Sequence, residues 1–403
     1  MTRPVAILFR RIGPYHRARL NAAARRFPSV AVELTASDRV YAWDPVEAPE
    51  LSRVTIFQDA AAATGAQVAQ RVAKTLDQLS PRAVAIPGWS TPFALAALRW
   101  CGVSRTPAIV MSESREHDTQ RSWRAETLKR RLVGLFSAAL AGGAPQLQYL
   151  RRLGMPEDRI FLGYDVVDNG HFARGAAAAR KDAAETRRHL GLPPKYFLAS
   201  SRFIAKKNLT RLLQAYARYR QFAPGKRWKL ALLGEGPMRQ AVLEQAQALE
   251  LGHDLLLPGF IQYDRLPYYY GLASVFIHAS TVEQWGLVVN EAMAAGLPVL
   301  VSAGCGCAPD LVQNGVNGYA FDPLDTEGLA RLMAQVADSG AGIARMGEAS
   351  RRIASEWAPD RFGHGLEQAL RIAAPPPARL GDGALLHLLL TMRRAAVAPE
   401  GCQ

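Results

Sequence analysis

The chain has 403 residues, of which 49% are hydrophobic and 21% charged, so its composition excludes a wholly disordered protein and allows large cores. At about 150 residues per domain, this length suggests two or three domains. Basic residues exceed acidic ones by 14, and most of the excess lies in residues 1–190, which hold 28 Lys and Arg against 17 Asp and Glu. Such an excess favours phosphate-bearing or anionic-surface partners, although a biased genome would produce the same composition.

The cysteines and the apolar runs indicate the compartment. Cys101, Cys305, Cys307 and Cys402 are too few and too scattered for a disulfide scaffold, and no histidine cluster beside them suggests zinc. The apolar run Val5–Phe9 is too short for a signal sequence, and no run approaches the roughly 18 residues that a membrane span needs. We therefore expect a cytoplasmic protein, either soluble or peripheral on the cytoplasmic membrane face.

Short apolar runs, bounded by turn residues, alternate with helical segments along the chain. In the first half, the predicted strands are Val5–Phe9, Ala83–Pro87 and Ala108–Ser112. In the second half, they are Phe197–Ser201, Lys229–Gly234, Asp254–Gly259, Ser274–Ala279 and Leu297–Ser302. Continuous apolar strands separated by helices are typical of parallel sheets covered on both faces. The pattern therefore predicts an α/β fold of two Rossmann-like, doubly wound domains.

The two sets of strands define the expected domains. We expect an N-terminal domain over residues 1–172, a linker over 173–194 and a C-terminal domain over 195–357. This segment is rich in Ala and Arg and ends in Pro193 and Pro194, so it should be part helix and part linker. In open α/β sheets, ligands bind beyond the carboxyl ends of the strands, so the site is expected in the cleft between the domains.

A polar loop and a predicted helix follow the strand Ser274–Ala279. Two carboxylates, Glu283 in the loop and Glu291 inside the helix, are separated by seven residues. Unpaired backbone amides at the start of the helix would bind a phosphate between these carboxylates, which can reach sugar hydroxyls. The amides belong to Gly286, Leu287 and Val288. The arrangement fits a nucleotide-sugar, and the alternative is a surface helix with incidental glutamates.

A basic loop follows the strand Phe197–Ser201. It carries Arg202 and Lys207 on the way into the next predicted helix. A guanidinium fork and an ammonium point charge on one short turn can clamp a diphosphate. The alternative is a solvated basic face, which is what most basic turns are.

The spacing of Glu283 and Glu291, with EAMAAGLPVLVS from the second glutamate onward, resembles the signature of glycosyltransferase family 4, whose members are retaining enzymes. The resemblance implies the GT-B fold, in which two Rossmann-like domains face each other across a cleft. In that family, the first glutamate contacts the donor sugar and the second binds the nucleotide ribose. An arginine and a lysine, spaced like Arg202 and Lys207, hold the donor pyrophosphate and stabilise the leaving group.

Weaker matches extend the resemblance over residues 197–323 and into the first domain. The backbone near Phe260 and Ile261 lies where the family meets the nucleobase. In the first domain, Gly13 stands in the loop that faces the donor phosphates in GT-B enzymes. His16 is expected to add positive charge beside this loop.

The first domain departs from the family at one place. Members often have a histidine after a strand of this domain, close to the donor sugar. Here Glu113 stands nearer that place and His117 follows a few residues later, so both are candidates for the donor-sugar or acceptor side. The family also implies a C-terminal helix, within residues 358–403, that completes the first domain.

Basic and apolar side chains are combined between residues 121 and 140. If this segment rested as a helix on an anionic bilayer, Trp123 and Phe136 would lie near the interface. The alternative is a helix that packs its leucines into the core and turns its basic face to solvent. The basic residues are Arg121, Arg124, Lys129, Arg130 and Arg131, and the leucines are Leu128, Leu132 and Leu135.

The resemblance implies a retaining glycosyltransferase that moves a sugar from a nucleoside-diphosphate sugar, with UDP favoured over GDP, to a hydroxyl acceptor. A glycan or lipid-linked glycan intermediate of polysaccharide biosynthesis fits as acceptor, and so does a small natural product. The sequence has no Asp-x-Asp motif, and cationic side chains can stabilise the leaving group, so we expect no metal and no cofactor. The alternatives are another GT-B enzyme, such as a nucleotide-sugar epimerase, and a basic protein that binds nucleic acid or membrane without catalysis. Dispersed charge and the lack of a nucleic-acid motif disfavour nucleic acid as partner.

Overall fold

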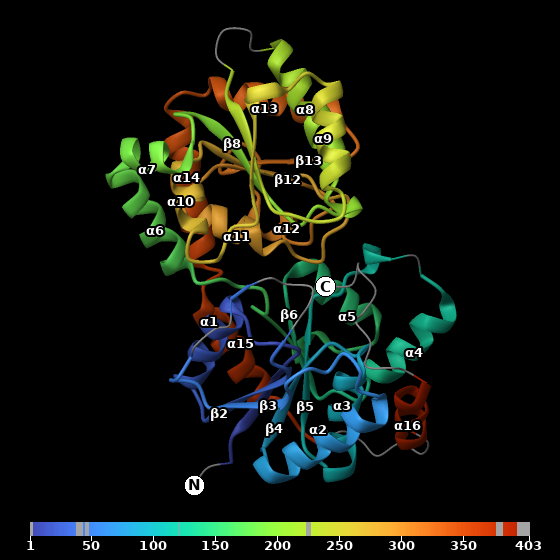
Figure 1. Cartoon of the computed structure of the whole chain (residues 1–403). Coiled ribbons are helices and arrows are strands. Elements are labelled where there is room, and N and C mark those ends of the chain that lie inside the picture. The colour runs from blue at the N-terminus through green and yellow to red at the C-terminus, as the bar shows by residue number, and fades with distance from the viewer. Residues whose placement is uncertain are drawn as a thin grey trace. The chain divides into compact units, whose positions relative to one another are not determined.

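The computed structural model describes residues 3–37, 43–44, 48–119, 121–222, 227–375 and 382–392. The chain divides into two compact units (Figure 1): unit 1 comprises residues 1–166 and 359–403, and unit 2 comprises residues 167–358. Each unit has one parallel β-sheet, as the sequence predicts. Among the described residues, no helix combines the length and the apolar character that crossing a membrane requires.

The sheet of unit 1 has seven strands in the order β3-β2-β1-β4-β5-β6-β7. The strands are β1 Val5–Phe9, β2 Ser29–Thr35, β3 Arg53–Phe57, β4 Ala83–Pro87, β5 Ala108–Ser112, β6 Ala138–Ala141 and β7 Ile160–Leu162. The main helices are α1 Pro14–Ala24, α2 Gly65–Leu79, α3 Pro92–Ser104, α4 Trp123–Val133, α5 Ala144–Arg152, α15 Pro359–Ile372 and α16 Asp382–Met392. A short 3-10 helix, η1 Glu116–Asp118, precedes α4.

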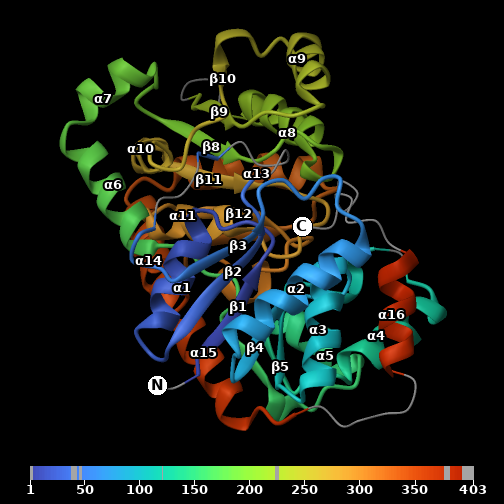
Figure 2. The same ribbon diagram turned by 60° about the horizontal axis from the view of Figure 1, so that its bottom comes forward.

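Side-chain alternation explains why helices cover both faces of this sheet (Figure 2). Successive strand residues point to opposite faces, and β1 is buried along its whole length. Ala6 and Leu8 join a core that includes apolar side chains of α2, α3 and α16. α15 packs on α1 so closely that a methyl group added at Gly363 would lie 2.7 Å from the carbonyl oxygen of Ala22. The helices α15 and α16 are therefore an integral layer of unit 1.

The sheet of unit 2 has six strands in the order β10-β9-β8-β11-β12-β13. The strands are β8 Tyr196–Ser200, β9 Lys229–Leu233, β10 Leu255–Gly259, β11 Val275–His278, β12 Val299–Ser302 and β13 Gly318–Phe321. The helices are α6 Asn169–Lys181, α7 Ala183–Leu190, α8 Leu209–Phe222, α9 Arg239–Ala248, α10 Leu266–Leu272, α11 Leu287–Ala294, α12 Ala308–Leu311, α13 Thr326–Asp338 and α14 Gly342–Ser355. The strand order reverses between β8 and β11, and ligands of open α/β sheets bind at such a switch point.

Residues 173–194, expected to link the domains, instead form most of α6 and all of α7 within unit 2. α6 packs against α10, and a methyl group added at Gly271 would lie 2.6 Å from the Cα of Ala176. The small residues of this Ala-rich segment let the two helix backbones approach closely. The sequence pattern missed this role because an Ala-rich helix carries little amphipathic signal.

Candidate functional site

The loop after β11 is held by backbone hydrogen bonds to the loop after β12. Glu283 forms a parallel β-bridge with Cys305. The N–H of Glu283 donates to the carbonyl of Gly304 at 3.1 Å, and the N–H of Gly306 donates to the carbonyl of Glu283 at 2.9 Å. The backbone of Glu283 is therefore fixed on both sides, which restricts the positions that its carboxylate can reach.

The carboxylate of Glu283 faces the basic loop after β8. Lys207, the last residue of the 3-10 helix η3 Ala205–Lys207, forms an ion pair with Glu283, and the Nζ of Lys206 lies 4.0 Å from Oε1. Burial alone raises the pKa of Glu283, but Lys207, together with His278 and Lys206, outweighs burial and holds this pKa well below its usual range. Glu283 is therefore an ionised hydrogen-bond acceptor rather than an acid.

His278, the last residue of β11, also lies beside Glu283. Its Nε2 is 3.8 Å from Oε2 of Glu283 and 3.3 Å from the Oγ of Ser280, which in turn donates to Oε2 at 3.4 Å. Burial lowers the pKa of His278 more than the nearby carboxylate raises it, so the imidazole is neutral. Sequence reasoning missed both side chains, although a histidine that ends the strand before a glutamate loop is a usable signal.

The helix α11 begins directly after this cluster. Gly286 caps it with a φ of +107°, a conformation that strains any other residue. The Cβ position of Gly286 lies 3.5 Å from Nε2 of His278 and 3.6 Å from Cγ of Glu283, so the helix start adjoins the carboxylate. The first amides of the helix, those of Leu287 and Val288, belong to this terminus. The structure thus brings the predicted anion site and the first predicted glutamate together.

Glu291, the second predicted glutamate, is fully buried within unit 2. The hydroxyl of Tyr270 donates to its Oε2 at 2.7 Å. Burial first, and then the charge of Glu291, raises the pKa of Tyr270 well above its usual value, so the phenol keeps its proton. The carboxylate therefore already has one strong donor before any ribose hydroxyl approaches it.

Arg202 lies in the loop after β8, half-buried and five residues before Lys207. The N–H of Phe203 donates to the carbonyl of Glu235 at 2.8 Å, which ties this loop to the turn after β9. Arg202 and Lys207 therefore share a loop with a fixed backbone, and it is Lys207 that contacts Glu283.

The expected nucleobase segment follows β10. Phe260 exposes 38% of its surface, and Ile261 is half-buried. The carbonyl of Gly259 accepts a hydrogen bond of 2.8 Å from Gly234 in the turn after β9, so the loops after β9 and β10 adjoin. The exposed ring of Phe260 offers a flat apolar surface at the carboxyl end of the sheet.

In unit 1, Gly13 and His16 begin α1. Gly13 is the N-cap residue, and its extended φ of −112° does not itself require glycine. The N–H of Gly13 donates to Nδ1 of His16 at 3.0 Å, and the imidazole packs 4.3 Å from the ring of Phe9. Burial, and secondarily Arg19, lowers the pKa of His16 to about 3. The expectation that His16 adds positive charge is therefore wrong, because the folded protein holds this imidazole neutral.

This neutral imidazole makes a prediction about stability and pH. Below pH 6.5 the unfolded chain binds a proton at His16, whereas the folded protein does not bind it until about pH 3. The free energy of unfolding therefore decreases as the pH falls from 6.5 to about 3. His16→Gln removes this contribution, and we expect its melting temperature to drop less than that of the wild type between about pH 7.5 and pH 5. If the melting temperatures of the two proteins fall equally over this pH range, His16 does not have a lowered pKa in the folded protein.

Glu113 and His117 lie in different surroundings. Glu113 follows β5, is half-buried and lies near enough to the fully buried Asp165 for its charge to act on that carboxyl. Burial, and then the charge of Glu113, raises the pKa of Asp165 well above its usual value, although Nη2 of Arg19 is 3.6 Å from its Oδ1. His117 is exposed on η1. The structure thus places Glu113, not His117, in a buried charged cluster at the carboxyl end of the sheet of unit 1.

Within the described ranges, no three His, Cys, Asp or Glu side chains are grouped so that they could hold a metal ion. The charged groups around Glu283 are instead two ammonium groups and the start of α11. These groups can bind an oxyanion, while the carboxylate of Glu283 can accept hydrogen bonds from a polyol.

The chain matches a family model described as Glycosyl transferases group 1 over residues 182–353. It is 38% identical over 102 residues to the sulfoquinovosyl transferase SQD2 of Arabidopsis thaliana, a match that covers 25% of this chain and 19% of the relative. It is 26% identical over 364 residues to a GDP-mannose-dependent alpha-(1-6)-phosphatidylinositol monomannoside mannosyltransferase of Mycobacterium tuberculosis, covering 81% of this chain and 89% of the relative. The first curated relatives are matched over less than half of their own length.

Solved structures share the fold. HepE of Anabaena, in a crystal structure described as a complex with UDP and glucose, superposes with a TM-score of 0.71 at 18% identity, covering 91% of this chain and 99% of that chain. Sucrose-phosphate synthase of Thermosynechococcus elongatus superposes with a TM-score of 0.72 at 17% identity, covering 91% and 98%. The two parallel sheets therefore have the architecture that these proteins share.

Proposed function

Because the chain belongs to the group 1 glycosyltransferases, a retaining family with the GT-B fold, we propose that it transfers a sugar from a nucleoside-diphosphate sugar to a hydroxyl acceptor. The observation that carries this proposal is the ion pair of Lys207 and Glu283 beside the start of α11. It combines a cation for a phosphate with a carboxylate for sugar hydroxyls.

The donor pyrophosphate is proposed to bind at the first amides of α11, which carry the positive end of the helix dipole. Lys207 and Arg202 would add the charge that stabilises the departing nucleoside diphosphate. These cations supply the stabilisation that a divalent ion provides in other transferases, so we propose that transfer is metal-independent.

Glu283 is proposed to orient the donor sugar. Its low pKa keeps it ionised, so it accepts hydrogen bonds from sugar hydroxyls and cannot protonate the leaving group. Ser280 and the neutral His278 hold this carboxylate from the side of β11 and act as positioning residues. In a front-face substitution, the leaving phosphate takes the acceptor proton, and no protein nucleophile is required.

Glu291 is proposed to bind the nucleotide ribose, and the backbone near Phe260 and Ile261 to meet the base. UDP is the first candidate for the nucleotide, because HepE is described with UDP and glucose. The mycobacterial relative is described as GDP-mannose-dependent, so GDP is the second. We propose a glycan or lipid-linked glycan as acceptor, with Glu113 on the donor-sugar or acceptor side.

The test is a donor screen on the purified protein. We expect UDP-glucose or another nucleotide-sugar to raise the melting temperature and, with an acceptor present, to release the nucleoside diphosphate. Mass spectrometry should show an acceptor that is heavier by one sugar, and a chelator should leave the rate unchanged. If no UDP-sugar or GDP-sugar changes the melting temperature or turns over, the proposal fails.

A further inference from the structure

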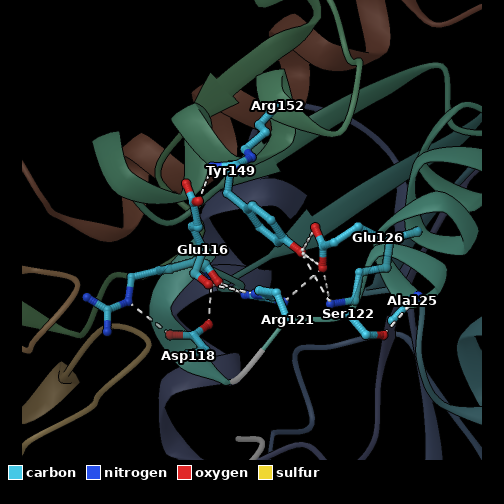
Figure 3. Close-up of polar contacts among 10 residues, drawn as sticks. Glu116, Asp118, Arg121, Ser122, Ala125, Glu126, Tyr149 and Arg152 are labelled. Atoms are coloured by element: carbon cyan, nitrogen blue, oxygen red, sulfur yellow. Dashed lines mark hydrogen bonds and ion pairs between the residues drawn. The ribbon is translucent and has the colours of Figure 1, made fainter.

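The helix α4 and the 3-10 helix η1 carry a set of charges that the transfer reaction does not use. In Figure 3, Glu126 of α4 turns toward Tyr149 of α5 rather than toward solvent. The hydroxyl of Tyr149 lies 3.0 Å from both carboxylate oxygens of Glu126, and Nζ of Lys129 lies 2.9 Å from Oε1. Arg121 adds an ion pair of 3.5 Å to the same oxygen and stacks over the ring of Tyr149. The single carboxylate of α4 is therefore held on the inner side of the helix.

The carboxylates of η1 are paired as well. Glu116 forms an ion pair with Arg152 of α5, and Asp118 pairs with Nε of Arg115 at 3.0 Å. The contacts of Glu116 with Arg152 and of Glu126 with Tyr149, drawn in Figure 3, fix η1 and α4 against α5, and the pair of Asp118 and Arg115 is local to η1. They also occupy the acidic groups of this region, so its negative charge is neutralised internally.

Another side of α4 is basic and exposed. Five of its exposed residues lie, at 100° per residue, within an arc of about 120°. They are Trp123, Arg124, Thr127, Arg130 and Arg131, here called the α4 face. Trp123 exposes 74% of its surface, and the guanidinium of Arg124 lies 5.4 Å from its ring centroid. Phe136, which the sequence placed near a membrane interface, is instead buried in the core, and Leu132 and Leu135 are buried there too.

Unit 1 exposes a further apolar side chain on α16. Figures 1 and 2 both place α16 next to α4 at one edge of unit 1. Leu386 and Leu390 of α16 are buried in the core of unit 1, whereas Leu388 exposes 55% of its surface. The helix next to α4 therefore also exposes an apolar side chain.

We propose that the α4 face docks on an anionic lipid bilayer. An indole on a helix that carries only cations on its outer side can settle at the headgroup level while the arginines pair with lipid phosphates. Single-stranded nucleic acid is a poorer fit, because its binding proteins use several stacked aromatics along a groove, and this face has one aromatic. The inference does not depend on the proposed transfer, because docking needs no donor.

The test is co-sedimentation of the full chain with vesicles of phosphatidylcholine, alone or mixed with phosphatidylglycerol. We expect binding to the mixed vesicles that weakens as salt is raised, and little binding to phosphatidylcholine alone. Arg124→Glu with Arg130→Glu should lower the bound fraction at least about tenfold, and Trp123→Phe should remove the blue shift of tryptophan fluorescence that accompanies binding. Arg218→Glu with Arg345→Glu, two exposed arginines of unit 2, makes the same change in net charge and should bind like the wild type.

Three outcomes would overturn the proposal: equal binding to both kinds of vesicle, wild-type binding by the Arg124→Glu, Arg130→Glu variant, or binding to single-stranded DNA but not to vesicles. The circular dichroism spectrum and the melting temperature of the Arg124→Glu, Arg130→Glu variant should match those of the wild type, because the substituted side chains are exposed. Transfer to a water-soluble acceptor should also be unchanged in this variant. That readout separates failure of docking from failure of the proposed transfer.

Discussion

Glu283→Ala is expected to lower the rate of sugar transfer at least about tenfold, which corresponds to a loss of roughly 1.4 kcal/mol of transition-state stabilisation. The substitution removes the ionised acceptor beside the start of α11 and leaves Lys207 without its carboxylate. Glu291→Ala should act differently and mainly weaken donor binding, because Glu291 is proposed to hold the ribose rather than the sugar. Steady-state kinetics with a fixed acceptor and varied donor separate an effect on kcat from one on KM.

The conservative variant Glu283→Gln separates loss of the charge from loss of the fold. It keeps the shape of the side chain and the bridge to Cys305 but removes the charge, so it should retain the fold and lose most of the turnover. Glu327→Gln, which removes an exposed carboxylate of α13, is the matched control and should behave like the wild type. If Glu283→Gln and Glu291→Ala both transfer sugar within a factor of about ten of the wild-type rate, the assigned roles are wrong.

Gly234→Ala is expected to lower the free energy of unfolding by about 3 kcal/mol or more. Gly234 has a φ of +127°, outside the region that alanine tolerates, and its added methyl group would lie 1.8 Å from the carbonyl oxygen of Ser201. Relief requires movement of the loop after β8, the loop that carries Lys207. Loss of stability should therefore be accompanied by weaker donor binding.

The control for this prediction is Gly191→Ala at the end of α7. Gly191 also has a positive φ, +65°, but no atom lies within 4 Å of its added methyl group. Only backbone strain remains there, so we expect Gly191→Ala to lower the free energy of unfolding by about 1 kcal/mol. Urea unfolding followed by circular dichroism measures both values, and equal losses in the two variants would show that the close approach of Gly234 to Ser201 is not maintained in solution.

The sequence predicted the two parallel sheets and eight of their strands, because those strands are continuous apolar runs, but it indicated no strand for β2, β3, β6, β7 or β13. β1, β4 and β5 begin and end at the predicted residues, and β8 to β12 differ from the prediction by at most two residues at either end. Glu283 and Lys207 were both selected from motifs on loops that follow strands. Their direct contact agrees with the rule that loops at one edge of a parallel sheet gather side chains from distant segments.

The missed features depend on tertiary contacts that no short pattern encodes. His278 faces Glu283 only because the loop after β11 folds back to form its bridge with Cys305. The neutral state of His16 results from its packing on Phe9, which a count of basic residues cannot show. Phe136 lies in the core because the chain turns after α4 toward β6.

The interrupted path of unit 1 has a consequence for biosynthesis. Residues 1–166 leave the ribosome first, yet α15, which lies over Leu140 and Leu162 at β6 and β7, emerges only after the whole of residues 167–358. Until residues 167–358 have been synthesised, the apolar surface of β6 and β7 that α15 later covers therefore stays exposed. Unit 2 can thus finish folding before unit 1 does, and the exposed apolar surface at β6 and β7 is where a chaperone would be needed.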